Sequence, residues 1–249
     1  MKRLIVTADD VGLDRGMNEG ALRAHREGIV TACSVVANGA AFDDAVARLR
    51  DAPGLEAGVH LTLVEETALT IGRPMPRNYL AFLARPARGI ESELRAQIEK
   101  VLAAGLRVTH LNGHQHLHVL PSVRPVVRKL AVEFGIPYVR RVADRGGRAG
   151  VARRVSLAAL HAIGRRAGGT NDCTIGVAEA GHLTAGRILE LLDEVEGLTE
   201  LVTHPGVAVS GYRQWRYQWD EETRALCDPR LREAIAARGI ELVAPSRAG

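Results

Sequence analysis

The chain has 249 residues, of which 46% are hydrophobic and 25% charged, and its net charge is +4. This composition excludes an intrinsically disordered chain and provides enough apolar side chains for a large core in one domain, expected to span residues 1–249. Cys33, Cys173 and Cys227 are odd in number and far apart. That spacing argues against a disulfide framework or a cysteine zinc site and favours a reducing compartment.

Strand-like apolar runs alternate with segments of helical periodicity along the whole chain. Strands are expected at residues 3–8, 31–38, 56–63, 107–112, 137–142, 173–177, 200–204 and 240–244. Helical spacing appears between them, for example over residues 121–134 and after the expected N-cap Thr184. Such alternation predicts parallel strands with helices outside. The length, and the lack of a GxGxxG first turn, favour a TIM-barrel-like (β/α) barrel, which need not be regular, over an open doubly wound sheet.

The N-terminal residues lead directly from Lys2 and Arg3 into the first expected strand. This start is too short, and turns acidic too soon, for a secretory signal peptide. No apolar run approaches the roughly 18 residues that a membrane-spanning helix needs. We therefore expect a cytoplasmic protein.

Polar residues suited to a reactive site stand at or near the carboxyl ends of several expected strands. In chain order they are Asp9, Asp10, Asn38, His60, His114 and His204. In a barrel these ends meet at one rim, so residues far apart in sequence would converge. One carboxylate with two imidazoles can hold a divalent ion and leave positions for water and substrate. Mixed nitrogen and oxygen ligands suit zinc, with magnesium, manganese or nickel as alternatives.

Asp9 and Asp10 are adjacent carboxylates at the end of the first expected strand. Successive side chains of an extended strand point to opposite faces, so the two should have different roles. One would bind metal while the other faces the reacting group. The plainer alternative is that one of them caps the turn before Gly12, and the histidines at the same rim weaken that alternative.

The positive charge is concentrated in residues 140–166, which hold eight arginines and a single acidic residue, Asp144. Nucleic acid is one conceivable partner of such a segment. However, no recognisable nucleic-acid module surrounds it, and only Tyr138 lies near enough to stack on a base. We expect no nucleic acid, but a patch that is solvated or faces an anionic surface.

Aromatic residues gather in YRQWRYQW, residues 212–219, which holds four of the nine in the chain. This stretch follows the seventh expected strand. Tyr212, Trp215, Tyr217 and Trp219 are therefore expected to contact substrate, as an amphipathic wall over an acceptor site. A packed lid without ligand contact is the alternative.

Four motifs together resemble those of the YdjC-like carbohydrate deacetylases. They are TADDVGL near the start, GVHLTL at 58–63, THLNGHQHLHVLP at 109–121 and VTHPG at 202–206. The resemblance implies a barrel-like fold and the removal of acetyl groups from N-acetylated amino sugars. By position, it implies the metal ligands Asp10, His60 and His114, the general base Asp9 and the acid His204.

The stretch HLNGHQHLH, residues 110–118, holds four of the nine histidines. The stretch lies between an expected strand and its following helix, and this position argues against a merely solvated loop. His114 is the expected ligand, and His110, inside the strand, is expected to be structural. His116 is expected to touch substrate or orient a ligand, and His118 to fix the loop. Where chitooligosaccharide-type relatives have three successive histidines, this chain has Gln115 in the middle.

The chemistry that the resemblance implies is hydrolysis of an acetamide. A divalent ion acidifies water, a carboxylate removes the proton, and a histidine protonates the departing nitrogen. The aromatic tail and the arginine-rich segment are more similar to the hopanoid-biosynthesis-associated branch. That branch implies an N-acetylglucosaminyl hopanoid lipid as substrate and peripheral contact with an anionic inner-membrane surface.

Three alternatives to the lipid substrate remain open. They are a deacetylase of soluble chitooligosaccharides, a barrel metallo-phosphoesterase, and a non-catalytic metal or sugar binder. A phosphoesterase usually needs a second metal and more carboxylates at the strand ends. A binder would need the ligands but would have no use for Asp9 or His204.

Overall fold

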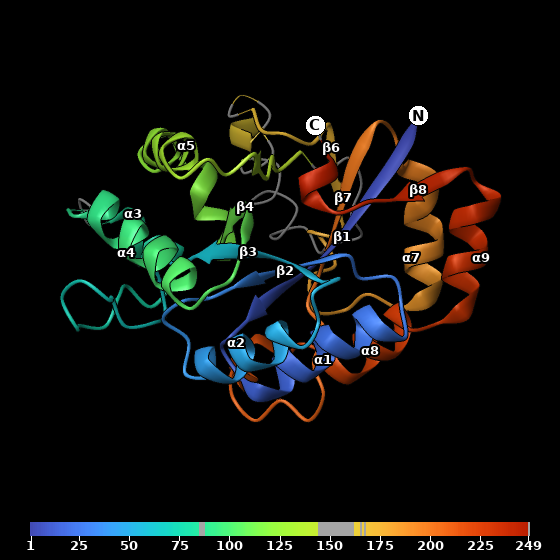
Figure 1. Cartoon of the computed structure of the whole chain (residues 1–249), viewed down its shortest axis with the longest axis horizontal. Helices are drawn as coiled ribbons and strands as arrows, with labels where there is room; N and C mark the ends of the chain where they lie inside the picture. Colours follow the sequence, from blue (N-terminus) through green and yellow to red (C-terminus); the bar gives the residue numbers. More distant parts are fainter. Residues whose placement is uncertain (85–87, 144–161, 165, 167, 249) are drawn as a thin grey trace.

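The structure, a computed structural model, describes residues 1–84, 88–143, 162–164, 166 and 168–248. A sheet of eight strands runs through its centre (Figure 1). The strands are β1 (Lys2–Val11), β2 (Ala32–Val35), β3 (Glu56–Leu61), β4 (Val108–Gly113), β5 (Tyr138–Val139), β6 (Cys173–Ile175), β7 (Leu198–Thr203) and β8 (Ile240–Leu242). Each lies where the sequence predicted a strand, although the strand expected at 137–142 is reduced to two residues.

The strand pairs of this sheet are all parallel, as the alternation of strands and helices predicted. Their order is β5-β4-β3-β2-β1-β7-β6, and β8 pairs with the first residues of β1. The later residues of β1 therefore lie between β2 and β7. The carboxyl end of β1, which carries the paired aspartates, is thus central in the sheet.

The sheet is curled, and the described residues do not show a full barrel. No ladder joins the end strands β5 and β6 within the described ranges. Separate hydrogen bonds link the two edges instead, from Thr170 N–H to Val139 O (3.0 Å) and from Thr174 N–H to Ala143 O (3.3 Å). The predicted TIM-barrel-like barrel, which need not be regular, is thus observed as a curled half-barrel, and at its edge Asn171 Oδ1 accepts the Arg141 N–H.

Helices cover the sheet and complete the α/β architecture (Figure 1). They are α1 (Arg15–Arg26), α2 (Phe42–Arg50), α3 (Tyr79–Leu83), α4 (Ile90–Ala103), α5 (Arg124–Glu133), α7 (Ala185–Leu191), α8 (Trp219–Leu226) and α9 (Pro229–Ala237). The expected N-cap is observed, since Thr184 Oγ1 accepts from Arg187 N–H. In the described ranges, we find no helix that combines the length and the apolar character needed to cross a bilayer.

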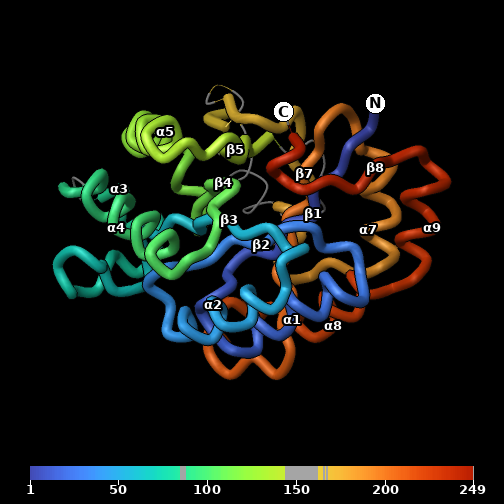
Figure 2. Tube along the Cα trace, viewed as in Figure 1, coloured from blue at the N-terminus to red at the C-terminus, as the bar shows by residue number. Residues whose placement is uncertain are grey.

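The core lies between the sheet and these helices, where their apolar stripes meet. α4, for example, buries Leu94, Ile98 and Val101 on one face. α1 packs closely on the segment that follows β7, because a Cβ on Gly20 would lie 2.3 Å from Gly206 Cα. The two chain ends lie near each other (Figure 2), where Arg3 donates to Arg247 O.

Candidate active site

Asp10, His60 and His114 come together at the carboxyl ends of β1, β3 and β4. Asp10 Oδ1 lies 3.2 Å from His60 Nε2 and 2.9 Å from His114 Nδ1. All three side chains are buried, and one ligand atom from each lies within 4.8 Å of the others. The structure thus gathers the three residues that the resemblance implied as metal ligands.

The backbone of β1 is irregular where it carries the paired aspartates. Its ladder with β2 shifts register between Ala8 and Val11, and Asp10 has a left-handed φ of 65°. Both carboxylates consequently face the same imidazole, with Asp9 Oδ1 3.8 Å from His60 Nδ1. The expectation that they point to opposite faces is wrong at this bulge, although their main partners do differ.

The hydrogen bonds of the two histidines fix which ring nitrogen faces Asp10. His60 Nδ1 donates to Asn112 Oδ1 (2.7 Å), because the Asn112 amide nitrogen is committed to Asp9 and Ser34. His60 Nε2 is then left with its lone pair toward Asp10. His114 Nε2 donates to Glu65 Oε2 (2.9 Å), which leaves His114 Nδ1 facing Asp10, as His60 Nε2 does. This second-layer carboxylate is typical of metal-binding histidines.

The charges of this cluster favour a cation. Burial alone would raise the pKa of Asp10, but His114 and His60 hold it well below its usual value. Burial alone would lower the pKa of His114, but Asp10 and Glu65 raise it to about 10. His114 is therefore protonated without a metal, and a divalent ion would compete with this proton for the ring nitrogen that faces Asp10. Two imidazole nitrogens and a carboxylate oxygen fit such an ion, zinc among them.

Asp9 belongs to a buried charge network centred on Arg140. Arg140 donates to both Asp9 oxygens (2.5 and 2.8 Å) and to Glu200 Oε1 (2.8 Å). Tyr138 OH and Thr7 Oγ1 each donate to Glu200 (2.7 Å). Burial would raise the pKa of Asp9, but the Arg140 guanidinium holds it well below its usual value. Asp9 is therefore an ionised carboxylate next to the Asp10–His60–His114 cluster.

Arg140 corrects one expectation about the arginine-rich segment. The sequence placed it in a solvated patch, whereas its side chain is fully buried beneath the site. Arg141 is half-buried and Arg166 is exposed, and residues 144–161 and 165 lie outside the described residues. The expected strand at 137–142 contains Arg140 next to a second arginine, Arg141, so the sequence did not distinguish the buried side chain from the half-buried one.

His204 follows β7 and reaches the other side of Asp10. Its Nε2 lies 3.9 Å from Asp10 Oδ2, and its backbone N–H donates to Glu222 Oε1 (2.5 Å) on α8. Burial lowers the pKa of His204. A lowered pKa makes its imidazolium form a stronger acid. Burial also raises the pKa of Glu222, to about 8.

The aromatic tail covers the cluster as a roof, tied down by two acidic residues that sequence reasoning missed. Tyr212 OH donates to Glu66 Oε1 (2.7 Å), and Trp215 Nε1 donates to Glu65 Oε1 (3.4 Å). The Trp215 ring centroid lies 5.3 Å from that of His114. Glu65 and Glu66 directly follow the GVHLTL motif, which was the available signal for them.

Tyr217 and Trp219 have different surroundings. The Tyr217 ring lies 5.2 Å from His204 and 5.6 Å from Trp215, so it lines the site. Trp219 is only 9% exposed and packs with Leu13 and Met17 in a small apolar cluster. Substrate contact was expected of both, but the burial of Trp219 leaves little of its ring for a ligand and makes it a core residue.

Two further expected substrate contacts, Asn38 and His116, lie outside the ligand cluster. Asn38 Nδ2 donates to Thr67 O (3.0 Å), and its buried Oδ1 has no hydrogen-bond partner among the described residues. His116 has a left-handed φ of 57°, and its buried Nδ1 is likewise unpartnered in the described part of the chain. Both atoms keep a capacity for a ligand, but the structure does not bring either to Asp10.

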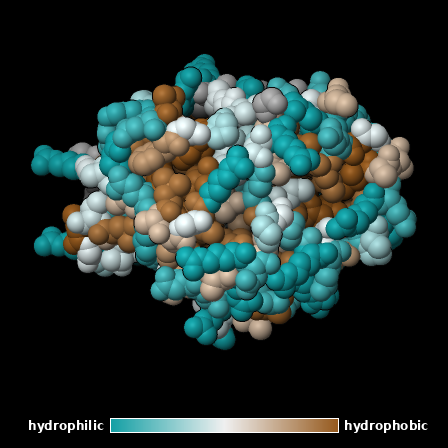
Figure 3. All heavy atoms as spheres, viewed as in Figure 1, coloured by the Kyte–Doolittle hydropathy of each residue, from teal (hydrophilic) through white to brown (hydrophobic). Residues whose placement is uncertain are grey.

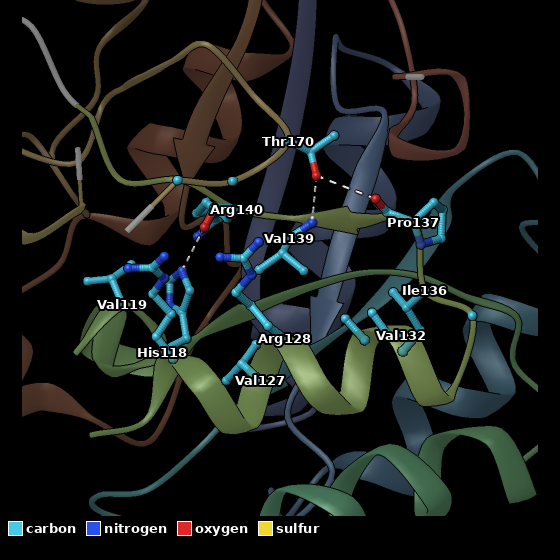
Figure 4. A pocket seen from close by; sticks show the side chains of 15 residues that line it. His118, Val119, Val127, Arg128, Val132, Ile136, Pro137, Val139, Arg140 and Thr170 are labelled. Atoms are coloured by element: carbon cyan, nitrogen blue, oxygen red, sulfur yellow. Dashed lines mark hydrogen bonds between the residues drawn. The ribbon is translucent and has the colours of Figure 1, made fainter. Parts of the chain in front are cut away.

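The other two histidines of the 110–118 stretch make internal contacts. His118 Nε2 donates to Arg140 O (3.1 Å), which joins the 3-10 segment η1 (His114–Val119) to the end of β5 (Figure 4). His110 is buried in β4, with its Nε2 3.3 Å from Ser34 Oγ. A Cβ on Gly58 would lie 2.4 Å from the His110 ring, so the glycine makes room for it.

A pocket of about 470 Å³ lies on the far side of His118, between α5 and residues 168–170 (Figure 4). Its walls include Val127, Arg128 and Ile136. None of the three clustered ligands lines it. Arg140, the ion-pair partner of Asp9, does line it, so the pocket adjoins the buried network behind the candidate active site.

Sequence comparisons relate the chain to a known family. A family model described as YdjC-like protein matches residues 3–237. A carbohydrate deacetylase of Geobacillus stearothermophilus is 32% identical, over 96% of this chain and 95% of that protein. A carbohydrate deacetylase of Brevibacillus brevis is 38% identical over 54% of this chain and only 58% of that protein.

Solved structures share the fold. A protein of Enterococcus faecalis named for cellobiose-phosphate cleavage superposes with a TM-score of 0.75, at 24% identity, over 98% of this chain and 97% of that one. A family 4 carbohydrate esterase of Streptomyces lividans, in complex with acetate, gives a TM-score of 0.53 at 12% identity, over 99% and 95% of the two chains. At such identities the likeness concerns the fold alone.

Proposed function

The chain belongs to the YdjC-like protein family, and from that premise we propose that it is a metal-dependent carbohydrate N-deacetylase. It hydrolyses the acetamide of an N-acetylated amino sugar and releases acetate and a free amine. One observation carries the proposal: the buried Asp10–His60–His114 cluster is flanked by the ionised Asp9 on one side and by His204 on the other.

Asp10, His60 and His114 would hold one divalent ion, which, when bound, supplies an acidified water and a polarised carbonyl. Asp9 accepts the proton of the attacking water. Its ion pair with Arg140 keeps the carboxylate charged and oriented, at the cost of a weak basicity. His204 donates a proton to the departing nitrogen, which is a poor leaving group until it is protonated.

The roof indicates how the sugar is held. Trp215 and Tyr217 are partly exposed and their rings lie next to His114 and His204, which suits stacking of a sugar ring there. Tyr212 holds the roof to Glu66. We therefore keep Tyr212, Trp215 and Tyr217 as substrate-binding residues, with Asn38 and His116 as more distant candidates.

The finer proposal concerns the substrate: an N-acetylglucosaminyl hopanoid lipid. It is supported by the resemblance of the YRQWRYQW tail to the hopanoid-associated branch. It is also supported by the aromatic character of the roof, which suits a large apolar aglycone. The metal proposed is zinc, for which the nitrogen-rich donor set is suited, with magnesium or another divalent ion as the alternative.

The test combines a metal assay with mass spectrometry. Purified protein is stripped with a chelator, reloaded with single divalent ions and incubated with N-acetylglucosaminyl compounds, free and lipid-linked. Loss of one acetyl group is expected only after reloading. Phosphate release from generic phosphoesters under the same conditions, without acetate release, would instead support a phosphoesterase.

Ligand variants make the test specific. His60→Ala and His114→Ala are expected to lose the bound metal, because each removes one of three ligands. Asp9→Asn is expected to keep the metal and lose turnover, because it is not a ligand. His25→Ala, at a half-buried histidine on α1 whose ring contacts Val30 O, is the control and should keep both. Full metal occupancy in both ligand variants would contradict the assignment.

A further inference from the structure

An apolar surface faces solvent on and beside α3. Its members are Ile71 (67% exposed), Tyr79 (41%), Leu80 (61%) and Leu83 (57%). They lie within thirteen residues of one another in sequence and account for four of the seven exposed large hydrophobic side chains among the described residues. We call this surface the α3 face. Single exposed apolar side chains are ordinary on protein surfaces, whereas a cluster of them often marks an interaction site.

The α3 face is held outward by ordered contacts beneath it. Phe82 is buried under α3, so the residues at 79, 80 and 83 share the opposite side of the helix. Asn78 caps the helix by accepting from Ala81 N–H (2.9 Å). The turn that carries Ile71 is anchored because Glu93 accepts the backbone N–H groups of residues 69 and 70. The exposure of these apolar side chains is therefore built into the fold.

The segment that carries the α3 face has only positive side chains, and of the carboxylates that follow it Glu93 is bonded to residues 69 and 70 and Glu91 to Lys129. Residues 67–90 contain four arginines and no aspartate or glutamate. Of these, Arg73, Arg77 and Arg88 are described and exposed. Figure 3 shows hydrophobic and hydrophilic side chains next to each other at the end of the molecule where Figure 1 places α3. Exposed apolar side chains and exposed arginines in one segment are complementary to an anionic lipid surface.

Two connections join the α3 face to the candidate active site, one along the chain and one through a hydrogen bond. The segment that leads into it begins with Glu65 and Glu66, whose carboxylates contact His114 and Tyr212. The N-terminus of α3 is tied to the histidine segment, because Tyr79 N–H donates to Gln115 Oε1 (3.1 Å). A body that docks on the α3 face therefore lies at the rim of the site.

We propose that the α3 face docks on an anionic lipid bilayer, with Ile71, Leu80 and Leu83 entering the interface and the arginines binding headgroup phosphates. The docking would present a membrane-borne glycolipid to the site, and that consequence rests on the proposed function. A second copy of the chain is a poorer occupant. A two-fold contact through this face would bring its arginines against the same arginines, without acidic partners.

The apolar part is tested by co-sedimentation of the full chain with vesicles of equal parts phosphatidylglycerol and phosphatidylcholine. The triple variant Ile71→Ser, Leu80→Ser, Leu83→Ser is expected to bind at least about tenfold more weakly, because three apolar side chains no longer enter the interface. Val132→Ser, at an 84% exposed site on α5, is the control and should bind as the unaltered chain does. Equal binding by the triple variant would overturn the proposal.

The electrostatic part is tested with vesicles of phosphatidylcholine alone, to which binding should be much weaker. Arg73→Gln with Arg88→Gln is expected to weaken binding to the anionic vesicles by about tenfold or more at low salt. Arg107→Gln with Arg224→Gln is the matched control, since both residues are exposed and lie outside the α3 face. Equal losses in both pairs would indicate a response to net charge and overturn the local assignment.

Two further measurements separate this proposal from its competitors. Light scattering should give a monomer mass; a dimer that the triple variant dissociates would make the α3 face a contact between copies and overturn docking. Release of acetate from a soluble N-acetylglucosaminyl compound should be unchanged in the triple variant. A chain that binds vesicles but deacetylates nothing would sink the proposed function alone, whereas a chain that deacetylates but ignores anionic vesicles would sink docking alone.

Discussion

Asn112 shows how single residues couple the proposed catalytic roles. Its amide oxygen accepts from His60, and its nitrogen donates to Asp9 and Ser34. One side chain thereby sets the tautomer of a proposed metal ligand and holds the proposed base. Asn112 and Ser34 are uncharged and do not titrate, so a sequence alone does not single them out, yet both hold Asp9 and His60 in position.

Glu65 gives the first prediction at the residue scale. Glu65→Gln should weaken metal binding by about tenfold to a hundredfold, because an amide is a poorer acceptor for His114 Nε2–H than a carboxylate. The measurement is competition with a chelating dye. Glu66→Gln, one residue along and bonded to Tyr212, is the control and should leave metal affinity within about twofold. Unchanged affinity in Glu65→Gln would remove it from the ligand support.

His204 gives a second prediction, on proton donation. His204→Ala should keep bound metal and lower kcat on an acetamide by about a hundredfold or more, because the leaving nitrogen must be protonated. The loss should be smaller on an activated acetyl ester, whose leaving group needs less protonation. Steady-state kinetics on the two substrates make the comparison. Equal losses would exclude the acid role and leave His204 a binding residue.

At the scale of elements, the β4–α5 connection and the tail combine to enclose the site. The 3-10 segment η1 presents His114 and is fixed by His118 to the end of β5. The tail returns over it through the Trp215 contact, and α8 then begins with Trp219 in the core. A roof that starts at Tyr212 and ends at a buried tryptophan is held at both ends.

That arrangement separates the two tryptophans experimentally. Trp219→Ala should lower the free energy of unfolding by about 3 to 5 kcal/mol, because it empties a core position. Trp215→Ala should keep most of the stability and reduce kcat/KM on the sugar substrate by about tenfold, because it removes a stacking face. Urea unfolding and kinetics on both variants check this. A purely stability-related loss in Trp215→Ala would make the roof a packed lid.

On the scale of the whole molecule, the interior contains many polar and ionisable groups. Arg140, Asp9 and Glu200 form a buried ion-pair network, and His110 and His118 are buried as neutral rings. Arg140 bonds to both carboxylates through its two terminal nitrogens, which makes burial of the charges tolerable, while its Nε has no partner among the described residues. The buried neutral histidines make the stability of the fold depend on pH.

The pKa values of these rings predict an acid-sensitive fold. Burial lowers the pKa of His110 to about 4 and that of His118 to about 3, from about 6.5 when unfolded. Between pH 6.5 and 4 these two rings bind protons in the unfolded chain but not in the folded chain, so their contribution to stability is complete above 6.5 and falls toward 4. The raised pKa of His114 acts in the opposite sense, because its contribution is complete below 6.5 and is lost as pH rises toward 10. The loss is on the order of 3 kcal/mol for His110. Urea midpoints of the chelated protein at pH 7.5 and 5 measure it; in His118→Gln the fall should be shallower.

The alternation of elements and the strand-end positions of Asp10, His60, His114 and His204 could be read from the sequence. Hydrophobic periodicity reports local structure, and parallel strands bring their carboxyl ends together whatever the details of the chain. The same reading predicted the N-cap at Thr184, because capping involves only neighbouring residues.

Only the tertiary structure decided the rest. Arg140 meets Asp9 across 131 residues, and no local pattern distinguishes a buried ion pair from an exposed arginine. Asp10 takes its left-handed φ where the ladder of β1 with β2 shifts register, which depends on how the two strands pair. Glu65, the burial of Trp219 and the open edge between β5 and β6 likewise depend on contacts between distant segments. Local propensity sets which elements form, whereas the pairing of charged and aromatic side chains is set by packing, which a single sequence does not encode in any short pattern.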